Sequence, residues 1–210
     1  FTTPLSAPVA TNQQDLRKNL LKAKGLLEDA GWYIDDGVLT NRDGIQFVFN
    51  ILLVSQSFER VMTGYVKNLK KLGINATYRT LDPTLYVERL KTFDFDMIVT
   101  SYGQSLSPGN EQRNYWQSST ADRMGSHNYA GIRSPAVDGL VDKIIYAETR
   151  NELIAACKAL DRVLWYGYYL IPNWYLPVYR LSYQNKFLTP TKLPLYYDPF
   201  QLLMTWWLAR

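Results

Sequence analysis

The 210-residue sequence contains one cysteine and one histidine. Cys157 alone cannot form an intramolecular disulfide or a cysteine-based zinc site. His127 alone argues against a Ser-His-Asp triad and against a multi-histidine metal site. The sequence also lacks the GxSxG, HExxH and Gly-rich phosphate-loop motifs of common catalytic and nucleotide sites. These absences argue against an enzyme, and we expect neither a metal nor a cofactor.

A strongly basic surface and a long apolar run are missing as well. The 23 Lys and Arg residues exceed the 19 Asp and Glu residues by a net charge of only +4. The densest basic run, residues 67–71, lies on one face of a predicted helix, so nucleic acid is not an expected partner. No apolar run approaches the roughly 20 residues that span a bilayer. The chain opens on Phe1 within a loop-like segment, and we take it for a mature form or, by preference, an excised fragment.

Aromatic residues are abundant, at 14% of a chain that is 47% hydrophobic and 20% charged. These values are typical of a globular protein, and Tyr and Trp often line binding surfaces as well as cores. Helical spacing predicts helices over residues 15–30, 57–72, 82–91, 134–147 and 152–166. Apolar or alternating runs predict strands over residues 32–39, 45–54, 74–80, 95–102 and 168–183. The alternation of helices with strands through the first half predicts an α/β fold with parallel pairing.

Two segments do not fit this alternation of helices and strands. Residues 103–131 are polar and Gly-rich, and their interleaved aromatic residues favour an ordered, functional loop over a disordered one. Residues 192–210 are too apolar for a solvated tail. They must pack either on this domain or on another domain outside the sequence.

Four motifs together resemble a known family of receptors. The residues that carry the resemblance are AKGLLEDAGW at 23–32, FDFDMI at 93–98, NY at 128–129 with SPAVDGL at 134–140, and IPNWY at 171–175. Their order and spacing are similar to those of the family 5 solute-binding proteins, the extracytoplasmic oligopeptide and dipeptide receptors of ABC importers. GQSLSPGNEQR at 103–113 and WYLPVYR at 174–180 resemble the Yej-type branch, which is associated with peptide and microcin C uptake.

The resemblance implies both a fold and partners. The fold would be the C-terminal lobe of a two-lobed, periplasmic-binding-protein-like fold (type II, cluster C), with a mixed sheet flanked by helices. Residues 1–14 would be an extended lead-in, residues 15–190 the lobe with half of the ligand cleft, and residues 191–210 a tail that returns to the N-terminal lobe. The partners would be a peptide or peptide-like ligand, the permease subunits and that N-terminal lobe. The location would be the periplasm, or the outer face of a Gram-positive membrane as a lipoprotein.

The candidate ligand-binding residues lie mainly after the predicted strand at 95–102, because α/β sheets place ligand crevices at the carboxyl ends of strands. Gly103 has no Cβ that would obstruct a peptide. The full set is Tyr102, Gly103, Gln104, Ser105, Leu106, Ser107, Asn110, Glu111, Arg113 and Trp174. The competing interpretation is that Tyr102 and Trp174 belong to the core and that Asn110, Glu111 and Arg113 pair with one another to hold the loop.

The loop also departs from the better-known oligopeptide receptors. The resemblance places an Asp that pairs with the ligand's α-amino group at position 105, where this sequence has Ser105. We therefore expect a ligand with a blocked amino end, unless Glu111 replaces the missing carboxylate. Arg113 or Arg180 is expected to pair with a ligand carboxylate or phosphate. The alternatives are a sugar, opine or nucleotide–peptide conjugate as ligand, a hydrolase using Glu111 with Asp96 or Asp122, and a docking module with no polar loop.

Overall fold

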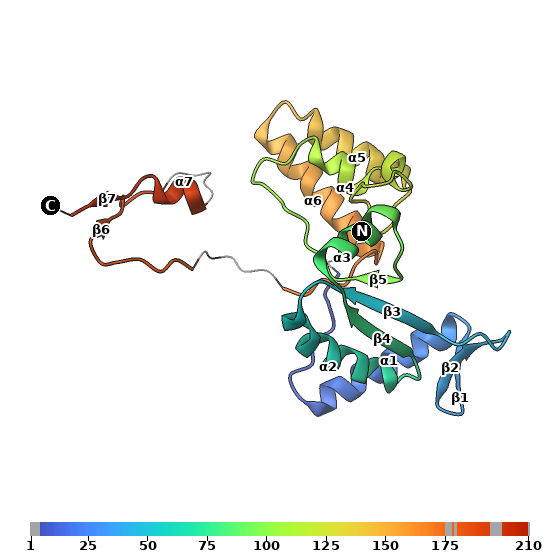
Figure 1. Cartoon of the computed structure of the whole chain (residues 1–210). Helices are drawn as coiled ribbons and strands as arrows, with labels where there is room; N and C mark the ends of the chain where they lie inside the picture. The colour runs from blue at the N-terminus through green and yellow to red at the C-terminus, as the bar shows by residue number, and fades with distance from the viewer. Residues whose placement is uncertain (1–4, 175–177, 179, 194–198, 210) are drawn as a thin grey trace. The chain divides into compact units, whose positions relative to one another are not determined.

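A computed structural model (Figure 1) describes residues 5–174, 178, 180–193 and 199–209. Its contacts define two compact units. The first unit comprises the chain up to Gly103 together with Pro108–Tyr169, and the second comprises Gln104–Ser107 and the chain from Leu170 onward. Within the described part of the chain, no helix combines the length and the apolar character that crossing a membrane requires.

A three-stranded parallel sheet lies at the centre of the first unit, in the order β4-β3-β5. Its elements are β3 (Val48–Leu53), η1 (Gln56–Phe58), α2 (Glu59–Lys70), β4 (Asn75–Thr80), α3 (Pro83–Thr92) and β5 (Met97–Ile98). Successive side chains of a strand point to opposite faces. Ile51 and Leu53 accordingly share a core with Met62 of α2, whereas Leu52 packs with Tyr86 of α3. Helices therefore cover the sheet on both faces.

A helix and a β-hairpin precede the three-stranded sheet in the chain and pack beside it. They are α1 (Gln13–Asp29), β1 (Trp32–Asp35) and β2 (Val38–Asn41). Leu39 of the hairpin is buried in a core with Leu20, Ala23 and Leu27 of α1. The helix begins two residues before the predicted start, because the side chain of Asn12 accepts the backbone N–H of Asp15 and caps it.

Helices form a further layer of the first unit (Figure 1). They are α4 (Glu111–Trp116), η2 (Ser118–Thr120), α5 (Pro135–Ile145) and α6 (Arg150–Tyr166). Val137 and Val141 of α5 are fully buried against Leu160 of α6, and Trp116 of α4 joins the same core. Cys157 is half-buried beside this core. Burial raises the pKa of its thiol despite the opposing effect of Arg150.

The second unit has little regular structure among its described residues. Its elements are β6 (Phe187–Leu188), α7 (Pro199–Leu203) and β7 (Trp207–Leu208), with β6 antiparallel to β7. The Trp206 ring packs against Tyr183, with their centroids 4.6 Å apart, while Trp207 is half-exposed. The return of residues 191–210 to an N-terminal lobe stays a prediction, as do the predicted domain boundaries.

One predicted strand is much shorter than expected, and another is absent from the described residues. The run at 95–102 forms a strand only at Met97–Ile98, because its aromatic end packs on α4 and on the loop at 126–129 instead of continuing the ladder. The run at 168–183 forms no strand in its described part, where most residues are exposed. Residues 175–177 and 179, which belong to the second predicted strand and to the WYLPVYR motif, lie outside the described residues.

Candidate functional site

The chain that leaves β5 is held at successive points. The backbone N–H of Val99 donates to the carbonyl of Leu52 at 3.3 Å. The hydroxyl of Tyr86, a buried residue of α3, donates to the carbonyl of Val99 at 2.8 Å. Tyr102 then enters a group of aromatic rings, so the backbone is fixed up to the start of the predicted loop.

The rings around Tyr102 come from α4 and from the loop that follows it. The centroid of Tyr102 lies 4.6 Å from that of Trp116, 5.3 Å from that of Tyr115 and 6.2 Å from that of Tyr129. Burial, with smaller contributions from Tyr129 and Tyr115, raises the pKa of Tyr102 to about 12. The Tyr102 phenol is therefore neutral at physiological pH and contributes apolar packing rather than charge.

Helix α4 contacts the chain on both sides of the exposed Gln104–Ser107 loop, which lies within the predicted loop at 103–131. The hydroxyl of Tyr115 donates to the carbonyl of Gly103 at 3.2 Å. The backbone N–H of Gly109 donates to Oε1 of Glu111 at 2.9 Å. Residues four apart on a helix share one face, so one face of this short helix holds the chain just before and just after the loop.

Glu111 is linked in turn to the core. Its Oε1 accepts a second hydrogen bond, from Nε2 of Gln112 at 3.2 Å. Gln112 is buried, and its Oε1 accepts the indole N–H of Trp116 at 2.9 Å. Burial alone would raise the pKa of Glu111, but hydrogen bonds from the N–H groups of Gly109 and Glu111 and from Gln112 lower it. Glu111 is therefore a carboxylate at neutral pH.

Arg113 points from α4 to α5 and its C-cap. Its Nη2 donates to Oδ1 of Asp142 at 3.3 Å and to the hydroxyl of Tyr146 at 3.1 Å. Its guanidinium lies 5.7 Å from the centre of the Tyr146 ring. The hydrogen bond to Tyr146, followed by that to Asp142, raises the pKa of Arg113 against the effect of burial. Arg113 thus joins two helices, a role that differs from the predicted pairing with Asn110 and Glu111.

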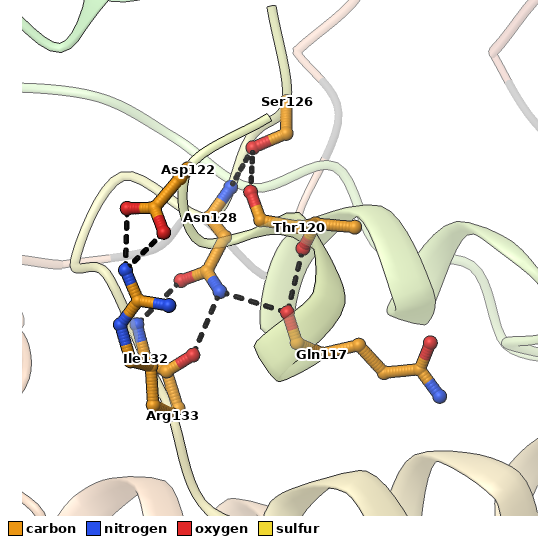
Figure 2. Close-up of polar contacts among 7 residues, drawn as sticks. All are labelled: Gln117, Thr120, Asp122, Ser126, Asn128, Ile132 and Arg133. Atoms are coloured by element: carbon orange, nitrogen blue, oxygen red, sulfur yellow. Dashed lines mark hydrogen bonds and ion pairs between the residues drawn. The ribbon is translucent and has the colours of Figure 1, made fainter. Parts of the chain in front are cut away.

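Figure 2 shows that Asn128 organises the loop after α4. Its side chain is fully buried, and Nδ2 donates to the carbonyls of Gln117 and Ile132, each at 3.0 Å. Its Oδ1 accepts the backbone N–H of Ile132 at 2.8 Å. One amide therefore holds together two segments fifteen residues apart and keeps the next residue, Tyr129, beside Tyr102.

The predicted ligand residues fall in both units. Tyr102, Gly103, Asn110, Glu111 and Arg113 belong to the first unit and lie along or beside α4. Those of the second unit are exposed, namely Gln104, Ser105, Leu106, Ser107 and Trp174, and so is Arg180. Leu106 is 61% exposed and Trp174 is 60% exposed. The assignment of these residues to ligand binding stays a prediction.

Carboxylates proposed for the hydrolase alternative have partners of their own. Oδ2 of Asp96 accepts the backbone N–H of Asn50 at 2.9 Å, and Asp122 forms an ion pair with Arg133 (Figure 2). In the described ranges, no group of three or more His, Cys, Asp or Glu side chains could hold a metal ion. The single histidine, His127, forms a hydrogen bond with the side chain of Asn114.

Sequence reasoning missed the polar residues that support α4. Oδ1 of Asp138 accepts the backbone N–H of Ser118 at 2.8 Å, and Oδ1 of Asp142 accepts Nε2 of Gln117 at 3.2 Å. Both carboxylates stand at helical spacing on α5. That spacing was visible in the sequence, but the partner segment was assigned to a loop without a helix.

Comparisons with a family model and with curated proteins agree on one family. Residues 1–123 match the family model described as "Bacterial extracellular solute-binding proteins, family 5 Middle". The chain is 43% identical over 211 residues to the "Probable peptide-binding protein YejA" of Agrobacterium fabrum, covering 100% of this chain and 34% of that protein. It is 34% identical over 194 residues to the "Peptidoglycan-binding protein YepA" of the same organism, covering 92% of this chain and 31% of that protein.

A solved structure shares the fold. The oligopeptide-binding protein AppA of Bacillus subtilis, solved with a nonapeptide, matches with a TM-score of 0.66 at 21% identity, covering 90% of this chain and 37% of AppA. This likeness confirms the predicted α/β lobe of the type II periplasmic-binding-protein fold. The sheet between its helices, predicted to be mixed, is parallel in all three of the strands β3, β4 and β5. The chain spans about a third of the length of the curated relatives that it matches.

Proposed function

This chain belongs to the bacterial extracellular solute-binding proteins of family 5, and we propose that it forms one lobe of the substrate-binding component of an ABC importer. The observation that carries the proposal is the 43% identity, along the whole chain, to a relative whose name records peptide binding. The exposed residues that follow Gly103 in the chain support it, since exposed polar residues can meet a ligand.

The proposed ligand is an oligopeptide or a peptide-like compound. Peptides offer the same backbone N–H and C=O groups whatever their sequence, so a broad receptor can pair with the main chain and leave roomy, hydrated pockets for side chains. Gln104, Ser105 and Ser107 supply neutral hydrogen-bonding groups, and all three are exposed. A loop without a carboxylate suits a ligand with a blocked or formylated amino end, and a microcin C-like compound is the other ligand that we propose.

The receptor would act outside the cytoplasm, together with an N-terminal lobe and the permease subunits. An N-terminal lobe of the same longer protein would complete the cleft, and closure of the two lobes about a hinge would bury the ligand. The permease subunits of the importer would then receive the ligand. The location would be the periplasm, or the outer membrane surface as a lipoprotein in a Gram-positive source. The receptor would bind and release the ligand unchanged, without a cofactor and without nucleic acid.

A second candidate ligand is a peptide that carries a sugar. The relative named for peptidoglycan binding, 34% identical to this chain, favours this class because peptidoglycan joins peptides to sugars. The sugar, opine and nucleotide–peptide conjugates predicted from the sequence belong to the same broader alternative. Aromatic rings such as Trp174, which is 60% exposed, can stack on a sugar as well as on an apolar side chain.

Calorimetry on the full-length receptor tests the proposal. We expect a random pentapeptide pool to bind with micromolar or tighter affinity, and the N-formylated pool to bind at least as well as the free-amine pool. Peptidoglycan-derived peptides with and without their sugar distinguish the second candidate. Turnover of any of these compounds, detected as a change in their mass after incubation, would instead favour the hydrolase alternative.

A further inference from the structure

Two side chains of α4 fix the ends of the exposed Gln104–Ser107 loop. We propose that Glu111 and Tyr115 are positioning residues for this loop, and that Glu111 holds the backbone rather than a charge on the ligand. The inference rests on the proposed function, because it concerns the same candidate ligand loop. The sequence suggests Glu111 as a replacement for the carboxylate that is missing at position 105. Here its carboxylate instead binds a backbone N–H of the protein.

The contacts bracket the loop on both sides. Before the loop, the Tyr115 hydroxyl donates to the carbonyl of Gly103 at 3.2 Å. After the loop, Oε1 of Glu111 accepts the N–H of Gly109 at 2.9 Å. Gly103, Gly109 and α4 all belong to the first unit. A single helix therefore fixes the positions of the residues on both sides of the loop.

The side chains of the loop itself are exposed to solvent. Within the loop, the N–H of Ser107 donates to Oγ of Ser105 at 3.2 Å. Holding the ends of a short segment removes many of its conformations. A loop restrained before the ligand arrives loses less entropy on binding, which is an advantage in affinity.

The helix that holds the loop is itself firmly placed. Trp116 is buried, and its indole N–H bonds to Gln112, which donates to the same Oε1 of Glu111. Arg113 bonds to Asp142 and Tyr146 on the other side of the helix. Glu111 is thus the end of a chain of hydrogen bonds that starts in the core. A side chain held in this way suits a fixed backbone anchor.

Oε1 of Glu111, the oxygen that holds the backbone, accepts its hydrogen bonds from groups of the protein itself. The donors are the backbone N–H of Gly109 and Nε2 of Gln112. An amide oxygen can accept the same two bonds, whereas it cannot balance the charge of a ligand amine. Glu111→Gln therefore keeps the anchor and removes the charge, which separates the two roles of Glu111.

The test uses the full-length receptor and four variants: Glu111→Gln, Glu111→Ala, Tyr115→Phe and the control Ser119→Ala, at an exposed position of η2. Affinity is measured by calorimetry with free-amine and N-formyl random pentapeptide pools. Amide hydrogen exchange of residues 103–110 is measured without peptide, and thermal melting checks the folding of each variant.

We expect Ser119→Ala to bind both pools within twofold of the wild type. Glu111→Gln should keep the wild-type rate of hydrogen exchange at residues 103–110 and should change the affinities for the two pools by the same factor. Glu111→Ala and Tyr115→Phe should each weaken binding about three- to tenfold, the effect of one lost hydrogen bond. Both should also speed exchange at residues 103–110 with little change in melting temperature. Tyr115→Phe retains the ring packing, so its effect reports the hydroxyl alone.

Two results would overturn the inference. One is a loss of free-amine binding in Glu111→Gln as large as that in Glu111→Ala, which would make the charge itself the binding group. The other is unchanged exchange at residues 103–110 in both Glu111→Ala and Tyr115→Phe. If the wild type binds neither pool, the proposed function fails, and the exchange rates still decide whether α4 holds the loop.

Discussion

At the scale of single residues, the candidate site combines fixed and exposed groups. Tyr102 is packed among Tyr115, Trp116 and Tyr129, whereas Ser105 is exposed three residues later. The change from packed to exposed side chains occurs at Gly103, whose carbonyl Tyr115 holds. Substitutions before this point should therefore affect stability, and substitutions after it should affect ligand choice.

Ser105→Asp tests the ligand choice. A carboxylate at this exposed position can still accept the N–H of Ser107, which bonds to Oγ of Ser105 in the wild type, and it adds the charge that a free α-amino group needs. We expect roughly tenfold tighter binding of free-amine pentapeptides, a typical effect of a charge-assisted hydrogen bond, and no gain for N-formyl pentapeptides. The matched control is Ser119→Asp on η2. Calorimetry showing equal affinities in Ser105→Asp and the wild type would contradict the prediction.

Tyr102 makes stability depend on alkaline pH. Burial raises its pKa from 10.0 to about 12, so between these values the unfolded chain loses the proton while the folded protein retains it. The free energy of unfolding should therefore fall as the pH rises through this window, by less than about 1.4 kcal/mol per pH unit because solvent screens this half-buried group.

Urea unfolding at pH 9 and pH 11 measures this loss, and Tyr102→Phe should reduce the difference between the two midpoints. Tyr33→Phe, at an exposed position of β1, is the matched control. An equal reduction in the two variants would show that Tyr102 is not the source of the pH dependence.

Asn128 is the residue whose loss should cost most stability near the site. Asn128→Ala leaves two carbonyls and one N–H without the side-chain bonds shown in Figure 2. We expect the free energy of unfolding in urea to fall by about 2–4 kcal/mol. Asn151→Ala, at an exposed position of α6, should change it by less than about 0.5 kcal/mol. Similar values for the two variants would mean that the Asn128 network contributes little.

At the scale of elements, the connection from α2 to β4 depends on Gly73. Its φ is +76°, and a Cβ there would lie 2.7 Å from the backbone N of Leu39. Gly73→Ala should therefore destabilise the protein by about 2–3 kcal/mol. Gly64→Ala, inside α2 with open space around it, should stabilise it by about 0.5–1 kcal/mol. Urea midpoints that move in the same direction for both would contradict this reasoning.

Helices were predictable from the sequence to within a few residues because their caps and apolar spacing are local. Thr149 and Glu152, for example, form a capping box at the start of α6. Strands depend on partners far along the chain. The apolar runs at 95–102 and 168–183 therefore did not show that Tyr102 would pack on α4 or that most of the described residues of the second run would be exposed. The short helix α4 was missed because most of its six residues are polar, so its sequence shows no apolar stripe. It is held by the buried Trp116 and by polar contacts to α5.

The candidate site was predictable only in part for the same reason. The position of the loop after a buried strand and the absence of a carboxylate at Ser105 could be deduced from the sequence and its resemblance to the family. The contacts of Glu111 with Gly109 and of Arg113 with Asp142 could not, because they depend on where α4 and α5 meet. These contacts change the role proposed for Glu111 from binding charge to holding backbone.

At the scale of the whole molecule, the chain accounts for about a third of the relatives that it matches. A lobe that supplies part of a cleft gains affinity only when the opposite wall is present. We therefore expect this chain alone to bind pentapeptides at least a hundredfold more weakly than the full-length receptor does. Calorimetry on both proteins measures the ratio, and equal affinities would show that the site lies entirely within these residues.

Native mass spectrometry of the full-length receptor, purified without refolding, tests the central proposal most directly. The account predicts a bound population that releases intact peptides or peptide conjugates when the collision energy is raised. The mass of the protein should then fall to that of the ligand-free full-length receptor. Release of free sugars or a bare metal ion without any peptide, or a ligand-free receptor that takes up no peptide when pools are added, would contradict it.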